Sequence, residues 1–516
     1  MQSDITYSDL IVEALARYPH REAFVAGDRR ITYGQAANLI AQFAATFNQC
    51  GVGAGDSVAL LSGNAPECWF AQAATCLLGG RFTGLQAAAG ASDQAEICAD
   101  AETTVLVAAE AFEERAQEII SRCETVEHLV IIPAQGGVGG FDPAARNGLP
   151  ALEPGPAGAE DPAWVQYTGG TSGRPKGVMV PHRALVQQTL SHLASWGIPE
   201  QPRYLAAGPI SHAAALPVLP TLMRGGTIVL MPAFDPDQWL HLVQREAINL
   251  SFVVPTMLYS ILDQAKPEAF DVSSLQTVVY GAAPTSPARL IEAIERIGPV
   301  FQQAYGQTEV VGVGTALRRD EHDPARPELL TSCGRPVVGA RLAVLGEAGS
   351  FLPHDQVGEL CLRTRATMLG YRNRPEETAE TLRDGWVHTG DMARLDERGF
   401  VHLVDRKKDM IISGGYNIYS REIEDVLHEH PAVAGAAVIG IPHEKWGEAV
   451  SAVVVRRPDR DASAEELIDF VRGRKGSIYA PKSVTFTGQL PTTTTGKVDK
   501  KLLREPYWND RDRAIN

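Results

Sequence analysis

The sequence has no cysteine pattern that is typical of a metal site or of a disulfide framework. Its seven cysteines are scattered along 516 residues, without a CxxC pair or a paired Cys/His spacing. Scattered cysteines of this kind are typical of reduced, mostly buried thiols in a cytoplasmic protein. We therefore expect a cytoplasmic location and no structural zinc site.

Positive charge is also scarce relative to negative charge. The chain has 47 Lys and Arg residues against 62 Asp and Glu residues, which gives a net charge of −15. A broad basic surface for nucleic acid or for an anionic membrane is therefore not expected. A local basic site for phosphate is compatible with this balance.

Long apolar runs are missing as well. No stretch approaches the roughly 18 uninterrupted apolar residues of a membrane-spanning helix. The first residues, MQSDITYSDLIVEALARYPHRE, contain acids at once and no basic segment followed by an apolar core. We expect neither a membrane span nor a signal peptide.

The remaining sequence is long enough for several structural units. At roughly 150 residues per domain, two to four units are expected. In residues 1–130, segments with helical periodicity such as 34–47 alternate with short apolar runs such as 103–109 (TTVLVAA). Similar alternation returns between 164 and about 335, after a Gly-, Pro- and Ala-rich connection at 134–163. This pattern predicts layered α/β structure with largely parallel sheets.

The pattern changes near residue 336, where short strands separated by turn residues predict an antiparallel β region. Further on, a helix is expected with Ser420 as its N-cap. The predicted fold class is α/β: a large multi-layer N-terminal domain, made of two α/β sheet subdomains plus the antiparallel β region, and a small mobile α+β C-terminal domain. The predicted boundaries are 1–405 for the large domain, 406–409 for a hinge and 410–516 for the small domain.

One loop has the composition of a phosphate-binding site. In YTGGTSGRPKGV, residues 167–178, glycines allow the backbone to approach an anion, and hydroxyls and Lys176 supply donors and charge. The loop is not a Walker A motif, because Arg174 and Pro175 stand between the last glycine and the lysine. It is not a GxGxxG motif either, and a mobile surface turn is the alternative.

This loop resembles the phosphate loop of the adenylate-forming superfamily, which comprises acyl- and aryl-CoA synthetases, luciferases and the adenylation domains of peptide synthetases. Other motifs of the superfamily follow in order over nearly the whole chain. They are PISHAAAL (209–216), YGAAP (280–284), AYGQTE (304–309), HTGDMARLDERGF (388–400), VDRKKDMIISGGYNIYSREIE (404–424) and PTTTTGKVDK (491–500). The chain looks most like fatty-acyl or aryl-CoA ligases.

The resemblance implies a two-step ligase that uses ATP, Mg²⁺ and coenzyme A. A carboxylate attacks the α-phosphorus of ATP, giving acyl-AMP and pyrophosphate, and a thiol then displaces AMP. The small domain is expected to rotate about a hinge at Lys408 between the two steps. Lys497 matches the adenylation lysine, which stabilises negative charge in the transition state of the first step.

The resemblance also assigns the nucleotide-binding residues. Thr308 matches the residue that contacts the α-phosphate, and Glu309 matches the Mg²⁺ ligand, although a surface acid is the alternative without the motif. Positions expected at the β,γ-phosphates are Thr168, Thr171, Ser172, Gly173 and Lys176. Positions expected at the adenine and ribose are Gly281, Ala282, Ala283, Tyr305, Asp391 and Arg406. Lys407 is expected to be solvated.

Four positions match the thioester-forming side of CoA-using relatives: Gly414, Gly415, Trp446 and Lys482. For Trp446, a packing tryptophan is the alternative. His212 matches the residue beside the substrate carboxylate, although a structural histidine that caps the loop is the alternative. The predicted acid pocket is lined by His212, Ala213, Ala214, Gly281, Val310 and Gly312.

The pocket composition favours a bulky or hydrophobic carboxylic acid. The stretch 211–215 (SHAAA) has no acid to pair with an ammonium group, and burying an unpaired ammonium is costly, so a free α-amino acid is disfavoured. The expected thiol is that of coenzyme A. The alternatives are a stand-alone adenylating enzyme that loads a carrier-protein thiol and a non-catalytic protein that binds acyl ligands. A homodimer is compatible with the sequence, which does not specify an oligomeric state.

Overall fold

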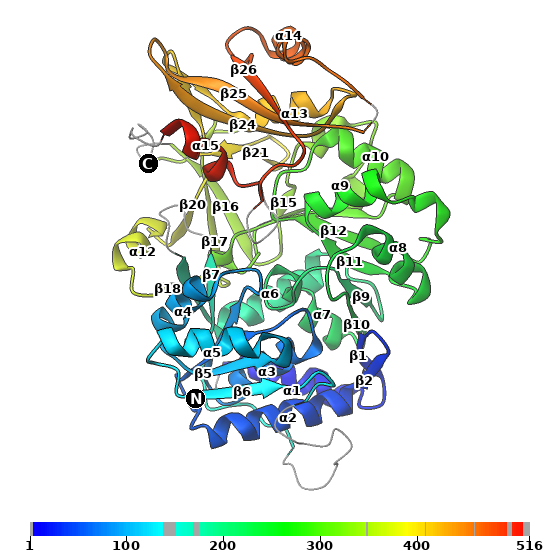
Figure 1. Cartoon of the computed structure of the whole chain (residues 1–516), viewed down its shortest axis with the longest axis vertical. Helices are drawn as coiled ribbons and strands as arrows, with labels where there is room; N and C mark the ends of the chain where they lie inside the picture. Colours follow the sequence, from blue (N-terminus) through cyan, green and yellow to red (C-terminus); the bar gives the residue numbers. More distant parts are fainter. Residues whose placement is uncertain are drawn as a thin grey trace.

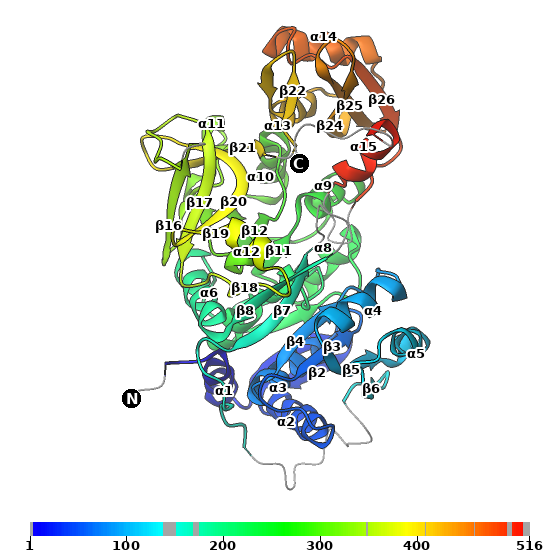
Figure 2. The same cartoon turned by 90° about the vertical axis from the view of Figure 1, so that its left-hand side faces the viewer.

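The computed structural model of the chain describes residues 4–137, 151–168, 175–346, 349–407, 409–458, 460–492 and 498–508. The strands in these ranges form four sheets, and helices pack against them (Figure 1). The N-terminal helices lie at one end of the molecule and the fourth sheet lies at the other (Figure 2). The mixed α/β class predicted from the sequence is confirmed.

The first sheet has nine strands, parallel from β13 to β1 and antiparallel at both edges. In spatial order these strands are β15 (Arg335–Pro336), β14 (Thr315–Leu317), β13 (Phe301–Tyr305), β12 (Thr277–Gly281), β11 (Leu250–Val253), β9 (Arg203–Ala206), β10 (Thr227–Leu230), β1 (Glu22–Ala26) and β2 (Arg29–Thr32).

The second sheet has seven strands, parallel from β7 to β6, with β8 and β18 antiparallel at one edge. In spatial order they are β18 (Gly370–Tyr371), β8 (Lys176–Pro181), β7 (Pro162–Thr168), β4 (Arg81–Leu85), β3 (Ser57–Leu61), β5 (Thr103–Ala109) and β6 (His128–Ile132). Strand β18 belongs to the part of the chain after residue 336 that is predicted to be an antiparallel β region, yet it pairs with this sheet.

The two large sheets share one hydrophobic core. Phe24 and Phe252 of the first sheet and Phe82 of the second belong to the same cluster of buried side chains. Apolar runs such as TTVLVAA form buried strands because helices cover both faces of a parallel sheet. The covering helices are α1 (Tyr7–Arg17), α2 (Tyr33–Gln49), α3 (Pro66–Leu77), α4 (Ala91–Asp100), α5 (Glu113–Arg122), α6 (His182–Ser195), α7 (Val218–Met223), α8 (Pro236–Arg245), α9 (Pro255–Gln264) and α10 (Pro287–Ile297).

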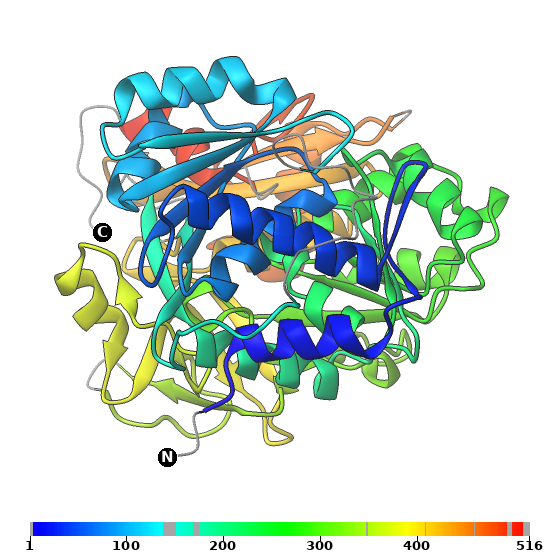
Figure 3. The same ribbon diagram turned by 90° about the horizontal axis from the view of Figure 1, so that it is seen from below.

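The two N-terminal helices begin at sequence-encoded caps. Thr6 and Asp9 form a capping box at α1, and Thr32 and Gln35 form one at α2. In each case the threonine oxygen accepts a backbone N–H that has no partner within the helix, and the third helical residue returns a hydrogen bond. Both helices lie on the near face of the molecule in Figure 3, where they close the end of the shared core.

The third sheet is antiparallel, as predicted for the region after residue 336. Its strands are β16 (Ala340–Leu345), β17 (Gly358–Thr364), β20 (Trp386–Leu395) and β19 (Leu382–Arg383), with β21 (Val401–Arg406) paired to β20. Two short helices accompany it, α11 (Pro327–Leu330) and α12 (Pro375–Thr381).

The fourth sheet has its own core, built from side chains of residues 411–486. Its strands are β23 (Tyr416–Ile418), β22 (Ile411–Ser413), β25 (Gly447–Arg456), β24 (Val433–His443) and β26 (Ser483–Thr487). The accompanying helices are α13 (Ser420–His428), α14 (Ala464–Lys475) and α15 (Lys500–Trp508).

The prediction of Ser420 as an N-cap is wrong by one residue. Tyr419 occupies the cap position, and Ser420 is the first residue of α13. The Ser420 hydroxyl donates to Asp405 Oδ2 at 2.8 Å, and the Ser420 N–H donates to the same oxygen at 2.6 Å. A carboxylate from β21 therefore caps the helix instead of its own serine.

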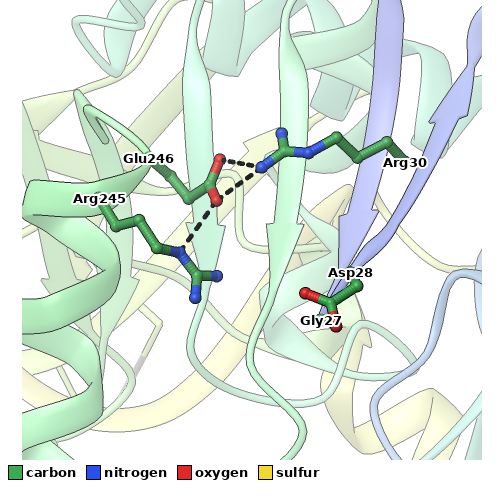
Figure 4. A pocket seen from close by; sticks show the side chains of 5 residues that line it. All are labelled: Gly27, Asp28, Arg30, Arg245 and Glu246. Atoms are coloured by element: carbon green, nitrogen blue, oxygen red, sulfur yellow. Dashed lines mark hydrogen bonds and ion pairs between the residues drawn. The ribbon is translucent and has the colours of Figure 1, made fainter.

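The hollow in Figure 4 is lined by an ion-pair network that joins strand β2 to helix α8. Glu246, nearly buried, accepts hydrogen bonds from Arg30 at 2.9 Å, from Arg203 at 2.8 Å and from Arg245 at 3.2 Å. Burial acts to raise the pKa of Glu246, but these arginines outweigh it and hold the pKa below its usual value. The network ties the β2 edge of the first sheet to strand β9 and to the end of helix α8.

In the described part of the chain, no helix has both the length and the apolar character needed to cross a bilayer.

Two histidines of α6 are fully buried and make the fold sensitive to acid. Burial lowers the pKa of His182 to about 4 and that of His192 to about 3, from 6.5. Between its folded-state pKa and 6.5, each histidine binds a proton in the unfolded chain but not in the folded chain. The free energy of unfolding therefore falls as the pH decreases from 6.5. Each such histidine contributes a slope of about 1.4 kcal/mol per pH unit within its window.

We expect the free energy of unfolding, measured with urea, to fall between pH 7 and pH 5. His192→Gln should make this dependence shallower, whereas His128→Gln, at an exposed position, should leave it unchanged. Equal slopes for the wild type and His192→Gln would contradict the assignment of a neutral buried imidazole.

Candidate active site

The predicted adenine and ribose residues lie where neighbouring parallel strands end. Gly281 ends β12, Tyr305 ends β13, and Gly281 pairs with Ala304 across the ladder. A Cβ on Gly281 would lie 2.2 Å from the carbonyl oxygen of Ala304, so only glycine fits there. Ala282 follows with a left-handed φ of 66°. The carboxyl edge of an α/β sheet is the usual position of a ligand site.

Asp391 is the centre of the site. The residue is buried, with an exposed fraction of 6%. Its carboxylate oxygen Oδ2 accepts hydrogen bonds from the Tyr305 hydroxyl at 2.7 Å and from Gln307 Nε2 at 2.9 Å. Arg406 Nε lies 3.1 Å from Oδ1. The structure therefore brings together three residues that the sequence predicts separately at positions 305, 391 and 406.

The charges in this cluster support each other. The Asp391 carboxylate raises the pKa of the Arg406 guanidinium above its usual value, and Glu309 contributes in the same direction. Burial, together with Asp391, raises the pKa of the Tyr305 hydroxyl well above its usual value. Tyr305 is therefore a permanent donor to Asp391.

Gln307 was missed by the sequence reasoning. It lies inside AYGQTE between two predicted site residues, and its Nε2 bridges Asp391 Oδ2 and the carbonyl oxygen of Thr389, 2.8 Å away. The only sequence signal for a role of Gln307 was its position inside the AYGQTE motif.

The phosphate-loop residues lie on the β7–β8 hairpin. Thr168 and Lys176 pair directly across the antiparallel ladder, so they stand at the two ends of the loop. Lys176 Nζ lies 4.0 Å from Glu377 Oε1 and 5.2 Å from the centre of the Tyr371 ring. The predictions for Thr171, Ser172 and Gly173 lie outside the described residues.

Tyr371 connects the lysine to the predicted metal ligand. Its hydroxyl donates to Glu309 Oε1 at 2.6 Å, while its ring faces Lys176. Thr308 and Glu309 belong to a single 3-10 turn (Thr308–Val310) that is separated from β13 by two residues. Carboxylate and water oxygens are the ligands that Mg²⁺ prefers, so Glu309 fits the expected ion. Sequence reasoning missed Tyr371, which lies in a two-residue strand outside the quoted motifs.

Three of the predicted acid-binding residues lie in or beside a second 3-10 turn (Ala213–Ala215), whose N-cap is His212. His212 Nδ1 lies 2.9 Å from Ser211 Oγ, and burial lowers the His212 pKa to about 4, so the ring is neutral at pH 7. Ala213 and Ala214 belong to this turn. Gly312, with a φ of 73°, lies against it, because a Cβ there would be 2.9 Å from Leu216 Cδ1.

Val310 is placed differently from the other predicted pocket residues. Its side chain is fully buried and packs with Leu362 and Val387 of the third sheet. The structure therefore places this side chain in a core cluster that joins the turn after β13 to the third sheet.

The predicted thioester-side residues come together on the fourth sheet. Gly414 and Gly415 have left-handed φ values of 59° and 82°, and the Gly414 N–H donates to the Trp446 carbonyl at 2.9 Å. The Trp446 ring stacks on His443, with centroids 4.2 Å apart, and Lys482 Nζ lies 5.2 Å from the ring centre. His443 was not singled out from the sequence.

The predicted hinge residue Lys408 and the predicted adenylation lysine Lys497 lie outside the described residues. The residues on either side of the segment that carries Lys497 contact each other. Thr492 pairs with Val498, and the Asp499 N–H donates to the Pro491 carbonyl at 2.8 Å.

Helix α15, which follows this segment, is fixed to α13 and to the predicted hinge. Lys500 Nζ lies 2.7 Å from both Glu424 Oε1 and the Ser420 hydroxyl oxygen. Arg504 forms an ion pair with Asp409. Burial raises the pKa of the Glu424 carboxyl to about 7, so this carboxylate depends on its cation to stay charged.

Two family models match the chain. The AMP-binding enzyme model matches residues 11–372, and the AMP-binding enzyme C-terminal domain model matches residues 422–497. The first match covers more than half of the sequence. The chain therefore belongs to the AMP-binding enzyme family, within the adenylate-forming superfamily, and the resemblance inferred from the motifs is confirmed.

Two relatives match over most of their length. A medium/long-chain-fatty-acid–CoA ligase, FadD8 of Mycobacterium tuberculosis, is 41% identical over 98% of this chain and 91% of the relative. A feruloyl-CoA synthase of an Amycolatopsis species is 37% identical over 95% of this chain and 96% of the relative. The predicted enzyme class, an AMP-forming acid–thiol ligase, agrees with both names.

Solved structures of MatB from Rhodopseudomonas palustris have the same fold. The ATP-bound form, 28% identical, matches with a TM-score of 0.88 over 98% of this chain and 99% of that chain. The apo form, 29% identical, matches with a TM-score of 0.79 over the same shares. The arrangement of this chain is thus more similar to the ATP-bound form.

Lys500→Met should destabilise the protein by about 3–5 kcal/mol, because it leaves the Glu424 carboxylate buried without its cation. The loss should be larger at pH 8 than at pH 5. Without Lys500 the folded-state pKa of Glu424 rises further, so at low pH the carboxyl takes up a proton and the penalty disappears. Urea unfolding at both pH values measures this difference.

Lys501→Met is the matched control, since Lys501 is the adjacent residue and is exposed. A loss of similar size in both variants, or a loss that does not depend on pH, would refute the role of the Lys500–Glu424 pair.

Proposed function

We propose that this enzyme activates a hydrophobic carboxylic acid as an acyl-adenylate and then transfers the acyl group to the thiol of coenzyme A. The observation that carries the proposal is the Asp391 cluster, in which Tyr305, Gln307 and Arg406 fix a carboxylate at the carboxyl edge of the first sheet. A fixed carboxylate can accept two hydrogen bonds from the vicinal hydroxyls of a ribose. Gly281 and Ala282 offer a flat backbone surface for the adenine.

The phosphates would extend from this cluster towards Lys176. A chain of contacts supports this direction. The turn of Thr308 and Glu309 follows Tyr305 in the sequence, and Glu309 accepts a hydrogen bond from the Tyr371 hydroxyl. The Tyr371 ring in turn faces Lys176. In the first step the carboxylate oxygen bonds to the α-phosphorus as the bond to pyrophosphate breaks. Thr308 positions the α-phosphate, and Lys497 offsets the charge that builds up on it.

Glu309 would hold Mg²⁺, which neutralises phosphate charge when it is bound. In the second step the sulfur of coenzyme A bonds to the acyl carbon and AMP leaves. The path of the thiol would be lined by Gly414, Gly415, Trp446 and Lys482.

The chain would divide into two domains and a hinge. Residues 1–405 would form the domain that binds the nucleotide and the acid, and residues 410–516 would form the small domain. Residues 406–409 would be the hinge, with Lys408 as its pivot.

The greater similarity to ATP-bound MatB than to apo MatB supports an arrangement suited to the adenylation step. In that arrangement α15 is fixed to α13 by Lys500. Lys497 would then be delivered to the acid by a segment closed at its base, where Thr492 pairs with Val498.

The group attached to the substrate carboxylate would be apolar. His212 is neutral at pH 7, Ala213 and Ala214 are small, and PISHAAAL supplies no carboxylate for an amino group. FadD8 acts on medium- and long-chain fatty acids, and the Amycolatopsis enzyme makes feruloyl-CoA, as their names state. Aliphatic and arylpropenoic acids are therefore the first classes to test. The alternative acceptor is the thiol of a carrier protein.

AMP release should depend on ATP, on an apolar acid and on free coenzyme A. We expect turnover with at least one acid in a panel of fatty, cinnamic, benzoic and polycyclic acids, and none with α-amino acids. Coupled detection of AMP and of the acyl-CoA product measures this. AMP release with an apolar acid and a carrier protein, but not with coenzyme A, would favour the carrier alternative.

Lys497→Ala should reduce the adenylation step by about 10²–10³ or more, because it removes the charge that stabilises the transition state. Thioester formation from supplied acyl-AMP should remain close to the wild-type rate. Lys501→Ala serves as the control and should leave both steps unchanged. An equal loss in the two steps for Lys497→Ala would show that the lysine does not act in adenylation.

A further inference from the structure

The HTGD segment, which supplies Asp391, lies in a bulge between β17 and β20. Glu359 pairs with Met392 and Cys361 pairs with His388, so one residue of β17 faces three residues of β20. Gly390 within this bulge has a left-handed φ of 68°. Residues 389–391 therefore leave the ladder with β17, although Asp391 still pairs with Arg406 of β21. The Gly390 and Asp391 N–H groups bind side-chain oxygens instead of β17.

Glu359 supplies the hydrogen-bond acceptor that the Gly390 N–H lacks in the interrupted ladder with β17. Its Oε1 accepts the Gly390 N–H at 3.1 Å, and its Oε2 lies 3.1 Å from His388 Nδ1. The side chain is 19% exposed, so the carboxylate is largely enclosed by the bulge. One carboxylate thus contacts the two residues that precede and follow Thr389.

Two other contacts complete the support of the segment. The Thr389 hydroxyl donates to the Leu360 carbonyl at 2.6 Å and accepts the Asp391 N–H at 3.1 Å. On the other side, the Lys407 N–H donates to the Gly390 carbonyl at 2.9 Å. The backbone on both sides of Gly390 is therefore fixed, and the Asp391 side chain points to Tyr305, Gln307 and Arg406.

Glu359, Cys361 and His388 also place a carboxylate oxygen, a sulfur and a ring nitrogen within 4.8 Å of one another, as metal ligands do. Arg383 Nη2, however, lies 2.9 Å from the same His388 nitrogen and 3.8 Å from Glu359 Oε2. A cation between these ligands would face the guanidinium. The charge balance of the cluster is already provided by Arg383, which favours a supporting role over a metal site.

We propose that Glu359 is a positioning residue for nucleotide binding, acting on Asp391 through the backbone of Gly390. The inference rests on the proposed function, in which Asp391 holds the ribose. When the carboxylate is removed, the Gly390 N–H loses its acceptor, the bulge relaxes and Asp391 is no longer held at one position. The acid pocket and the Lys176 side of the site do not contact Glu359 in any of the bonds described above.

Glu359→Ala should weaken ATP binding about tenfold, which corresponds to the loss of one enclosed hydrogen bond. In steady-state assays the KM for ATP should rise by this factor, while kcat and the KM for the acid should stay within about twofold. Glu359→Gln should recover most of the affinity, since an amide oxygen can still accept the Gly390 N–H. Glu397→Ala, in the exposed turn after β20, is the matched control.

ATP binding to each folded variant, measured by calorimetry with thermal melts alongside, provides a readout that needs no acid substrate. Unchanged ATP affinity in Glu359→Ala would overturn the proposal, as would equal changes in kcat and in both KM values. A Glu359→Gln variant with no recovery would also overturn it. If the wild type binds ATP but no acid supports AMP release, the proposed function fails while the role of Glu359 is still decided by the affinities.

Discussion

The carboxylate of Asp391 is the constraint on which the candidate site depends. It joins the end of β13, through Tyr305 and Gln307, to β20 and β21 of the third sheet, through its own strand and Arg406. These segments are separated by more than 80 residues in the sequence, and an enclosed carboxylate with several donors is stable only when all of them are in place. Assembly of the nucleotide site is thus coupled to docking of the third sheet on the first.

The sequence predicts the secondary structure well where apolar runs and caps are clear. The run at 103–109 became β5, because such runs are buried on at least one face. The position of β18 was not predictable, since a two-residue strand has no periodicity. The cap of α13 was assigned to Ser420, whereas the capping carboxylate is Asp405, 15 residues earlier in the chain.

The candidate site was predictable only to the extent that motifs carry it. Tyr305, Asp391 and Arg406 were assigned from three separate motifs, and the structure brings them into one cluster. Gln307, Tyr371 and Glu359 were missed for a common physical reason. Each acts by touching a residue that is distant in sequence or by filling a local irregularity, and neither property is visible in residue spacing. Buried geometry, rather than residue type, defines their roles.

The shared core of the two large sheets has a consequence for how such a chain can be divided. Phe24, Phe82 and Phe252 pack in one cluster, so a break between the two sheets would expose an apolar interface on both fragments. The fourth sheet encloses its own core and is joined to the rest through a short segment around residue 407. A gene split, a domain exchange or a fusion to another protein would therefore be tolerated near that segment and not between the two large sheets.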